Sequence, residues 1–392
     1  MIASEKLKFW TKSFRSLIRN TRILIGCPPQ KVQGPAIILF PLEPATLCCG
    51  LAGILTVKGA SMAPDDIQAA IRRILEGLQP MKEQNIQALN SGSIPLDSYL
   101  GGSRHLDSLG NALLDLKQDA AAEHLFFSEK ETAALREQIH FLQNFLAAEE
   151  SMLEQSAGHF TTLDLESINS RLVMLKDILW ALDKDILNNI GRIASLAGNR
   201  HGNGVSREAF RKYRKLNYLL NCLDRLEVRG RDSAGIQISF TLADEQAFEN
   251  AVAFLRTNSL YDEFLRRIQP GDWLNGSIGI SFKKREEKKE SRGETTITFT
   301  YKTSAIIGEL GRNVRELREG IAGDALFHEF ARLETGFETA FAHTRWASVG
   351  SITDDNCHPV NNFTLTSKTD LSHGELPAAC RDYPCYGKGN WL

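Results

Sequence analysis

A thiol at the start of a short apolar run is the first group in the chain that could do chemistry. Cys49 precedes residues 50–55, whose length and apolar character predict a buried strand. A thiolate attacks carbonyl carbon readily, but an unpaired cysteine is also among the side chains that proteins bury most often. Cys49 is therefore a candidate nucleophile only if other parts of the chain supply the remaining groups that such chemistry needs.

Two stretches far downstream are rich in residue types that bind polar ligands. They are Arg229-Gly230-Arg231-Asp232-Ser233-Ala234-Gly235 and His343-Thr344-Arg345-Trp346-Ala347-Ser348-Val349-Gly350, the second followed by His358-Pro359. Arg345 stands just after an expected strand, 337–343, and a guanidinium can hold a carboxylate through two parallel hydrogen bonds. Without its neighbours, Arg345-Trp346 is better explained as a surface cation stacked on an aromatic ring.

Taken together and in this order, these stretches resemble the glutaminase domain of the class II glutamine amidotransferases, and within that family the glucosamine-6-phosphate synthase branch most closely. The specific part of the match is Arg-Gly-x-Asp-Ser-Ala-Gly, since an Arg-Gly dipeptide alone is a weak signal. The resemblance covers residues 49–58 and, with interruptions, 206–362. It implies an α+β fold, the four-layer αββα sandwich of N-terminal-nucleophile hydrolases.

The resemblance also implies roles for individual residues. Cys49 matches the catalytic nucleophile, Arg345 the arginine that holds the α-carboxylate of glutamine, and Trp346 the tryptophan of a mobile loop that covers the bound substrate. Ser348 replaces the family's usual threonine and keeps its hydroxyl. Val349 replaces a histidine that is common in the synthase branch, so we expect loop closure or domain coupling to differ here.

Three further positions match residues beside the nucleophile or the pocket. Arg229 and Gly230 match the family's Arg-Gly turn, where Gly230 would permit a backbone conformation closed to other residues. His358 matches a histidine that the family places before a proline. A lone histidine is more often structural than catalytic, and we do not assign His358 as the base.

The position of Cys49 within the chain poses a problem for this mechanism. In an N-terminal-nucleophile enzyme, the α-amine of the first residue has a pKa near neutrality and serves as the base for its own side chain. Cys49 gains that amine only if residues 1–48 are removed, as the leader is in some members of the family. Because Gly50 reproduces the family's Cys-Gly start, we expect cleavage between Cys48 and Cys49. The alternatives are a translation start further downstream, or an uncleaved and inactive domain.

Two departures from the family pattern affect the expected activity. A long helical stretch separates Cys49 from the Arg-Gly turn, where the familiar enzymes have one short helix. The family's oxyanion-hole Asn-Gly should follow His358, whereas the Asn-Gly pairs here, Asn203-Gly204 and Asn275-Gly276, precede it. We therefore expect a fragment that lacks its oxyanion-hole residues and is poorly active in glutamine hydrolysis by itself.

The sequence accordingly divides into four expected parts. They are a leader or propeptide at 1–48, the first strand of the glutaminase domain at 49–59, an all-helical insertion at 60–205, and an incomplete remainder of the glutaminase domain at 206–392. Apolar residues at three- and four-residue steps predict long helices within the insertion, one of them opened by a capping box at Ser128–Glu131. Downstream, the alternation in 236–240 predicts a half-buried strand.

Composition excludes several function classes. The formal net charge is −2 with no basic stripe, which argues against a nucleic-acid-binding protein. Seven cysteines form an odd set without a convincing signal peptide, which favours the reducing cytoplasm, and no apolar run is long enough to cross a membrane. A zinc site is the alternative reading of one cysteine- and histidine-rich region: Cys357, His358, His373, Cys380 and Cys385. Its Cys-x4-Cys spacing does not match the paired knuckles of structural zinc.

The function implied by the resemblance is glutamine-dependent amide transfer. Glutamine would be hydrolysed through a cysteine thioester, and the ammonia would convert fructose 6-phosphate to glucosamine 6-phosphate on a C-terminal domain missing from this chain. The expected partners are glutamine and a sugar phosphate; a homo-oligomer is allowed, and no cofactor or metal is required. The alternatives are a glutaminase that serves another ammonia acceptor, and a non-catalytic regulatory or scaffold module in which Cys49 is blocked.

Overall fold

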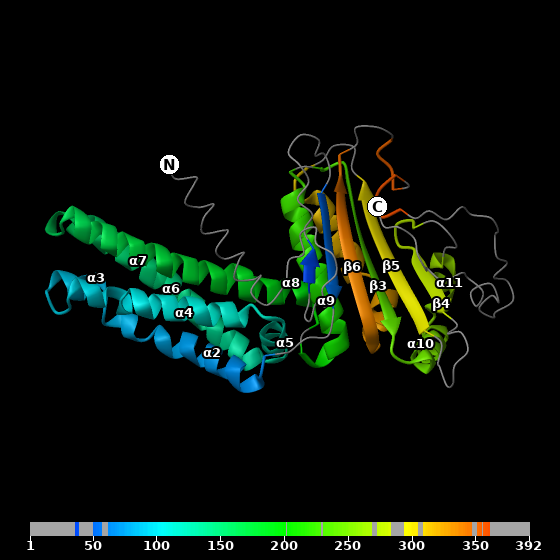
Figure 1. Ribbon diagram of the computed structural model, residues 1–392, viewed down its shortest axis with the longest axis horizontal. Coiled ribbons are helices and arrows are strands. Elements are labelled where there is room, and N and C mark those ends of the chain that lie inside the picture. Colours follow the sequence, from blue (N-terminus) through cyan, green and yellow to red (C-terminus); the bar gives the residue numbers. More distant parts are fainter. Residues whose placement is uncertain are drawn as a thin grey trace, which may run out of the picture. The chain divides into compact units, whose positions relative to one another are not determined.

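The chain forms two compact units in the computed structural model, one made of helices and one built on a β-sheet (Figure 1). The structure describes residues 36–38, 50–56, 62–200, 202–228, 230–268, 273–283, 294–304, 309–346, 351–354 and 356–360. We call the part within 60–194 and 200–204 the helical unit, and the rest of the described chain the sheet unit. The α+β class expected from the sequence is confirmed.

The sheet is antiparallel, and its strand order pairs an early strand of the sheet unit with the last described strand of that unit. The order is β1-β2-β6-β3-β5-β4, with β1 (Ala36–Ile38), β2 (Gly50–Thr56), β3 (Ser233–Leu242), β4 (Ile278–Lys283), β5 (Glu294–Ser304) and β6 (Thr335–Arg345). The first described residue after Cys49 is Gly50, which pairs with Thr344. Residues Ala36–Ile38, within the segment that the sequence set apart as a leader, add a short edge strand to β2.

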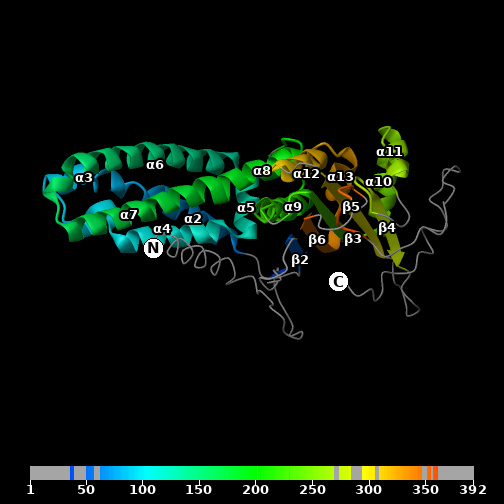
Figure 2. The ribbon, with the colours of Figure 1, turned by 90° about the horizontal axis from the view of Figure 1, so that it is seen from above.

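Five helices cover one face of this sheet, which we call the helix-covered face (Figure 2). They are α9 (Arg207–Leu226), α10 (Glu245–Thr257), α11 (Tyr261–Arg267), α12 (Arg312–Ala322) and α13 (Ala325–Ala331). Alternation along β3 and β5 turns Ile238 and Phe299 toward them. Phe299 lies edge-on to Phe327 and tilted against Phe330, with ring centroids 5.1 Å and 5.9 Å apart. Removing one such buried ring costs about 3–5 kcal/mol.

The other face, which we call the polar face, carries a row of hydrogen bonds between side chains of β3 and β5. Gln237 donates to Thr300 at 2.9 Å, while Ser239 pairs with Thr298 and Thr241 with Thr296, both at 2.8 Å. The expectation of a half-buried β3 is wrong at its start, where Ser233–Ile238 are buried on both faces. The reason is a segment distant in sequence: residues 351–354 and 356–360, which we call the strap, cover the polar face there, with the His358 carbonyl lying against Gly235.

The four-layer sandwich implied by the family resemblance needs a second sheet against the polar face. Within the described residues there is one sheet with helices on one side, which corresponds to a helix layer and a sheet layer. The finer architecture therefore stays a prediction.

Every described element of the helical unit is a helix. The main ones are α2 (Pro64–Gly77), α3 (Ile86–Asn90), α4 (Ser103–Leu116), α5 (Asp119–Phe127), α6 (Glu129–Ser156) and α7 (Thr162–Trp180), with a π-helix at Ala181–Leu187 leading to α8 (Asn188–Leu196). The expected apolar stripes are buried; Leu135 and Leu142 of α6 and Leu175 of α7 are fully so. These side chains pack helices, as their spacing predicts.

Local sequence signals predicted the position of one helix start in this unit correctly but not its capping. The helix expected at Ser128 does begin there, but the capping box is wrong, because no side-chain hydrogen bond caps the helix at Ser128. The Glu131 carboxylate instead accepts from Gln68 at 2.6 Å and contacts His124. A complete capping box occurs further on, between Thr161 and Asp164 at the start of α7.

Candidate functional site

The start of β2 is held tightly at one end of the sheet. The N–H of Gly50 donates to the hydroxyl Oγ1 of Thr344 at 3.1 Å, and the Thr344 side chain is fully buried. A Cβ placed on Gly50 would lie 2.8 Å from Cβ of Leu226 in α9 and 2.9 Å from the Thr344 hydroxyl. Only glycine fits between them, so packing explains why a glycine follows Cys49 in this fold.

Gly230 brings the Arg-Gly turn to the same end of the sheet. A Cβ on Gly230 would lie 2.8 Å from the carbonyl carbon of Arg345 and 3.0 Å from the amide nitrogen of Trp346. The N–H of Asp232 donates to the Arg345 carbonyl at 3.2 Å. The missing side chain of Gly230 is what permits this close approach to the end of β6.

A buried carboxylate that sequence reasoning missed supports the same turn. Glu227 is fully buried, and its side chain accepts from the N–H groups of Gly311 and Val314 at the start of α12. Its own carbonyl accepts from the N–H of Gly230 at 3.3 Å. Burial raises the pKa of Glu227, and the two amide hydrogen bonds partly offset that rise. No local pattern reveals the pairing, since the partners lie more than 80 residues away.

Arg345 is the last residue of β6, and Trp346 follows it. The guanidinium Nη1 donates to the Ser351 carbonyl at 3.1 Å, which ties Arg345 to the strap. A guanidinium has five N–H donors in a fixed fork, so this contact is compatible with binding a carboxylate through others. The Trp346 side chain is 45% exposed. Both positions suit a group that meets a ligand from solvent.

His358 meets His343 on the polar face. The two rings lie edge to face with centroids 4.4 Å apart and an interplanar angle of 76°. Burial, then the charges of His358 and Arg345, lower the pKa of His343 to about 4. Burial, Arg345 and Lys302 also lower the pKa of His358. Both imidazoles are therefore neutral at pH 7, and the buried Nδ1 of His343 has no hydrogen-bond partner within the described structure.

The strap is fastened to the end of β5 as well as to Arg345. Ser304 Oγ donates to the Asp354 carboxylate at 2.8 Å, and the buried Lys302 reaches the Asp354 carbonyl at 3.4 Å. Cys357, also buried, directs its Sγ toward the Thr303 carbonyl at 3.8 Å. Burial raises the pKa of Cys357, so it is a neutral thiol at pH 7 and a poor nucleophile.

The residues expected at the site divide into two groups. Gly230, Arg345, Trp346 and His358 lie at the same end of the sheet, next to the start of β2. The other three, Cys49, Arg229 and Ser348, lie outside the described residues. The groups that sequence reasoning did not single out are His343, Thr344, Glu227 and Lys302. Of these, His343 and Thr344 stand inside the motif and could have been found from strand alternation.

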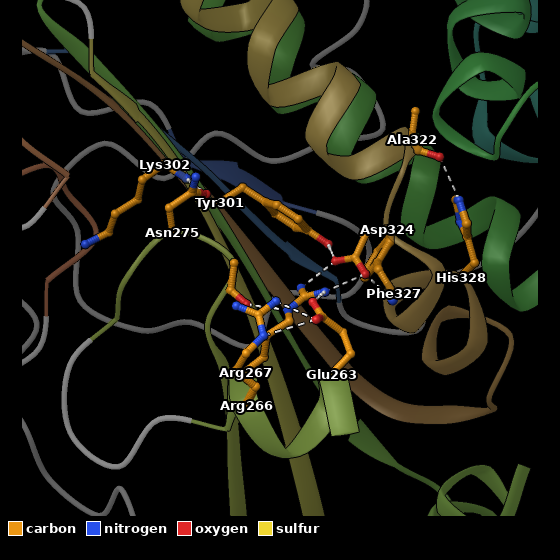
Figure 3. Close-up of polar contacts among 11 residues, drawn as sticks. Glu263, Arg266, Arg267, Asn275, Tyr301, Lys302, Ala322, Asp324, Phe327 and His328 are labelled. Carbon is orange, nitrogen blue, oxygen red and sulfur yellow. Dashed lines mark hydrogen bonds and ion pairs between the residues drawn. The ribbon is translucent and has the colours of Figure 1, made fainter. Parts of the chain in front are cut away.

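The upstream Asn275-Gly276 pair has a structural role (Figure 3). Asn275 Oδ1 accepts from the Lys302 N–H at 2.9 Å, and the Gly276 carbonyl accepts from Arg267 Nε at 2.6 Å. The same arginine forms a two-bond ion pair with Asp324 at 2.8 Å and 2.6 Å, and Tyr301 donates to that carboxylate at 2.6 Å. These groups lock a turn and the start of α13 to the sheet.

Metal ligation finds no support in the part of the chain that the structure describes. No group of three or more histidine, cysteine, aspartate or glutamate side chains there is arranged to hold a metal ion. His373, Cys380 and Cys385, from the zinc alternative, lie outside the described residues.

Comparisons with known proteins leave the chain without an assigned family. No protein-family model matches it, and neither a curated protein nor a solved structure is significantly similar to it. Among the described helices, none combines the length and hydrophobicity that a bilayer crossing requires.

Proposed function

We propose that this chain is the glutaminase part of a class II glutamine amidotransferase. The observation that carries the proposal is convergence: Gly50, Gly230 and Arg345, which lie far apart in the sequence, meet at one end of one sheet. His358 joins them through the strap. These are the residues that flank or form the three motifs of the family resemblance, and nothing in local secondary structure requires them to be neighbours.

The proposed reaction uses Cys49 once the chain before it has been removed. The α-amine of Cys49 takes the thiol proton, and the thiolate attacks the side-chain amide carbon of glutamine. The C–N bond breaks, ammonia leaves with the transferred proton, and a thioester remains. Water then attacks the thioester, releasing glutamate and restoring the thiol.

Substrate binding would rest on the residues around the end of β6. Arg345 would hold the α-carboxylate with guanidinium donors beside the one it gives to Ser351. Trp346 would cover the bound glutamine, and Ser348 would offer it a hydroxyl. Arg229 would lie next to the nucleophile in the turn that Gly230 and Glu227 hold in place.

The polar face supports the four-layer architecture as part of this proposal. Besides its hydroxyl row it carries Leu51 and Phe337, which are 43% and 47% exposed within the described structure. Apolar side chains at two places on one sheet face are what a second sheet packed against it would bury. We propose that a second sheet, with helices outside it, completes the αββα sandwich.

The ammonia acceptor follows from the branch that the motifs resemble. We propose that ammonia passes to fructose 6-phosphate on a sugar-phosphate-binding domain of the longer protein. Serine- and threonine-rich phosphosugar loops beyond Leu392 would support this acceptor, whereas a different domain there would indicate another one.

The first test is the intact mass and N-terminal sequence of the full-length gene product purified from its own host. We expect a mature chain that begins at Cys49. A chain that begins at Met1 would remove the α-amine base and would contradict the proposal.

The second test is covalent labelling of that product with a diazoketone analogue of glutamine. We expect one adduct at Cys49, abolished in Cys49→Ala and strongly reduced in Arg345→Ala. Cys48→Ala, if processed normally, is the matched cysteine control and should label like wild type. Arg266→Ala is the arginine control, since Arg266 is 72% exposed and bonds to Glu263 on α11. Equal labelling of Arg345→Ala and Arg266→Ala would refute the role of Arg345.

One observation favours the non-catalytic alternative. Residues Ala36–Ile38 pair with Leu55, Ile54 and Gly53, so part of the expected leader is built into the sheet of the uncleaved chain. If the leader stays attached, Cys49 has no α-amine, and a regulatory or scaffold module becomes the better assignment. The N-terminal sequence of the mature protein separates the two functions.

A further inference from the structure

We infer that Thr344 is a positioning residue for the nucleophile, acting through the backbone of Gly50. This inference rests on the proposed function, because it gives a role to a residue that touches neither the thiol nor the substrate. Thr344 lies immediately before the arginine proposed to bind the substrate carboxylate and has no role in the family resemblance.

The contact that carries the inference is the hydrogen bond from Gly50 N–H to Thr344 Oγ1, 3.1 Å long and buried. A side-chain hydroxyl thus accepts from the first described amide of β2. The N–H of Gly50 belongs to the peptide unit that joins it to Cys49. Since a peptide unit is planar, a hydrogen bond to this N–H holds the backbone at the residue that directly follows the nucleophile.

Packing against α9 restricts Gly50 further. The Cβ of Leu226 lies so close that a Cβ on Gly50 would be 2.8 Å from it. Gly50 is therefore held against both α9 and the hydroxyl of Thr344. Loss of the hydroxyl would leave a buried N–H without an acceptor and would let the start of β2 shift.

This contact matters for the proposed reaction because Arg345 directly follows Thr344 in the sequence. Because side chains alternate along a strand, Thr344 faces Gly50 on the helix-covered face while Arg345 belongs to the polar face. One strand end thus fixes both the backbone next to the nucleophile and the proposed carboxylate ligand. The separation between them decides whether a bound glutamine presents its amide carbon to the thiol.

This arrangement predicts a specific kinetic signature. Arg345 remains in place when the hydroxyl is lost, so binding of glutamine analogues should change little. The bond-forming step should slow, because a displacement of about 1 Å of a reacting group can cost roughly 100-fold in rate.

The experiment compares Thr344→Val, Thr344→Ser and Thr339→Val in the full-length gene product, labelled with the diazoketone analogue of glutamine. Thr339 is the matched control, since it lies on the same strand and its hydroxyl bonds to the Ile54 carbonyl of β2 at 3.4 Å. The maximal inactivation rate and the half-saturating analogue concentration are measured for each variant, after N-terminal sequencing confirms equal processing and thermal unfolding confirms folding.

We expect Thr344→Val to lower the maximal inactivation rate by roughly 10- to 100-fold with a half-saturating concentration within threefold of wild type. Thr344→Ser, which keeps the hydroxyl, should recover most of the rate, and Thr339→Val should match wild type.

Two results would overturn the inference without touching the proposed function. One is a Thr344→Val rate equal to that of Thr339→Val, and the other is a change confined to the half-saturating concentration. Failure of Thr344→Ser to recover the rate in a folded and processed protein would also count against the hydroxyl. Absence of labelling in wild type would instead refute the proposed function, and the inference with it.

Discussion

The two faces of the sheet are built from the same strands but depend on different kinds of contact. The helix-covered face is apolar and aromatic, and its few charges are buried pairs such as Arg267–Asp324. The polar face carries hydroxyls, and at one end it gathers His343, Arg345 and the strap. Changes on the first face should therefore alter stability, whereas changes at the end of the second should alter ligand chemistry more than stability.

The largest expected effect on stability lies on the helix-covered face. Asp324→Ala should cost about 3–5 kcal/mol of unfolding free energy, because it removes the close carboxylate partner of the buried Arg267 charge. It also removes the acceptor for Tyr301 and for the Phe327 N–H at the start of α13. Urea unfolding measures the loss. Glu263→Ala is the control, since that half-exposed carboxylate lies 3.9 Å from the same arginine and should cost under about 1 kcal/mol. Equal losses would contradict the division between buried and exposed pairs.

Lowering the pH should cause a smaller loss of unfolding free energy, which originates at the polar face. The pKa of His343 is about 4 in the fold against 6.5 for the unfolded chain, so the unfolded state binds more protons between these values. Stability from this group is complete above pH 6.5 and is lost as the pH falls toward 4, by roughly 2 to 3 kcal/mol after allowing for the ring's contact with water. Unfolding free energies at pH 7 and pH 4.5 measure the loss. His343→Gln should reduce the difference, and an unchanged difference would exclude His343 as its source.

The strap can be tested with two glycines on the polar face. Gly235→Ala would place a Cβ against the His358 carbonyl oxygen and 3.0 Å from Pro359 Cδ, so the strap must move, at a cost of about 1–3 kcal/mol. Labelling by the glutamine analogue should fall with it. Gly53→Ala has its nearest neighbour at 3.8 Å and should change stability by less than about 0.5 kcal/mol. If both variants label like wild type, the position of the strap is irrelevant to the site.

Trp346→Ala should have the smallest effect on stability but a large effect on binding of the glutamine analogue. Trp346→Ala removes a side chain that is 45% exposed and should change unfolding free energy by no more than about 0.5 kcal/mol. If Trp346 covers bound glutamine, the half-saturating concentration of the analogue should rise severalfold. A loss of several kcal/mol with unchanged labelling would place Trp346 in the core instead.

Elements defined by local signals were predictable from the sequence. The strand β6 runs through the range expected from the sequence and ends at Arg345. At Ser128 no side-chain hydrogen bond caps the helix, and Glu131, the far half of the expected capping box, interacts with Gln68 and His124 of other helices. These partners lie elsewhere in the sequence, so the local pattern does not reveal them.

The candidate site was predictable only in part. Resemblance pointed to Gly230, Arg345 and His358, and the structure brings them together. Two of the contacts that hold them in place, those of Glu227 and of the strap with β3, carried no sequence signal. Glu227 bonds to amides 84 and 87 residues away, and the strap covers a strand that lies more than 100 residues before it. Such partners follow from the tertiary fold, so periodicity and capping rules cannot reveal them.

The pairing of β2 with β6 also affects when this part of the sheet can assemble during protein synthesis. Gly50 and Thr344 are 294 residues apart, and a ribosome that adds 5–20 residues per second needs roughly 15–60 s to pass from one to the other. During that interval β2 exists without its main neighbour, while all of the helical unit is synthesised and can fold. The end of the sheet that holds the candidate site therefore assembles late, so any reaction that depends on it begins only after most of the described chain has been made.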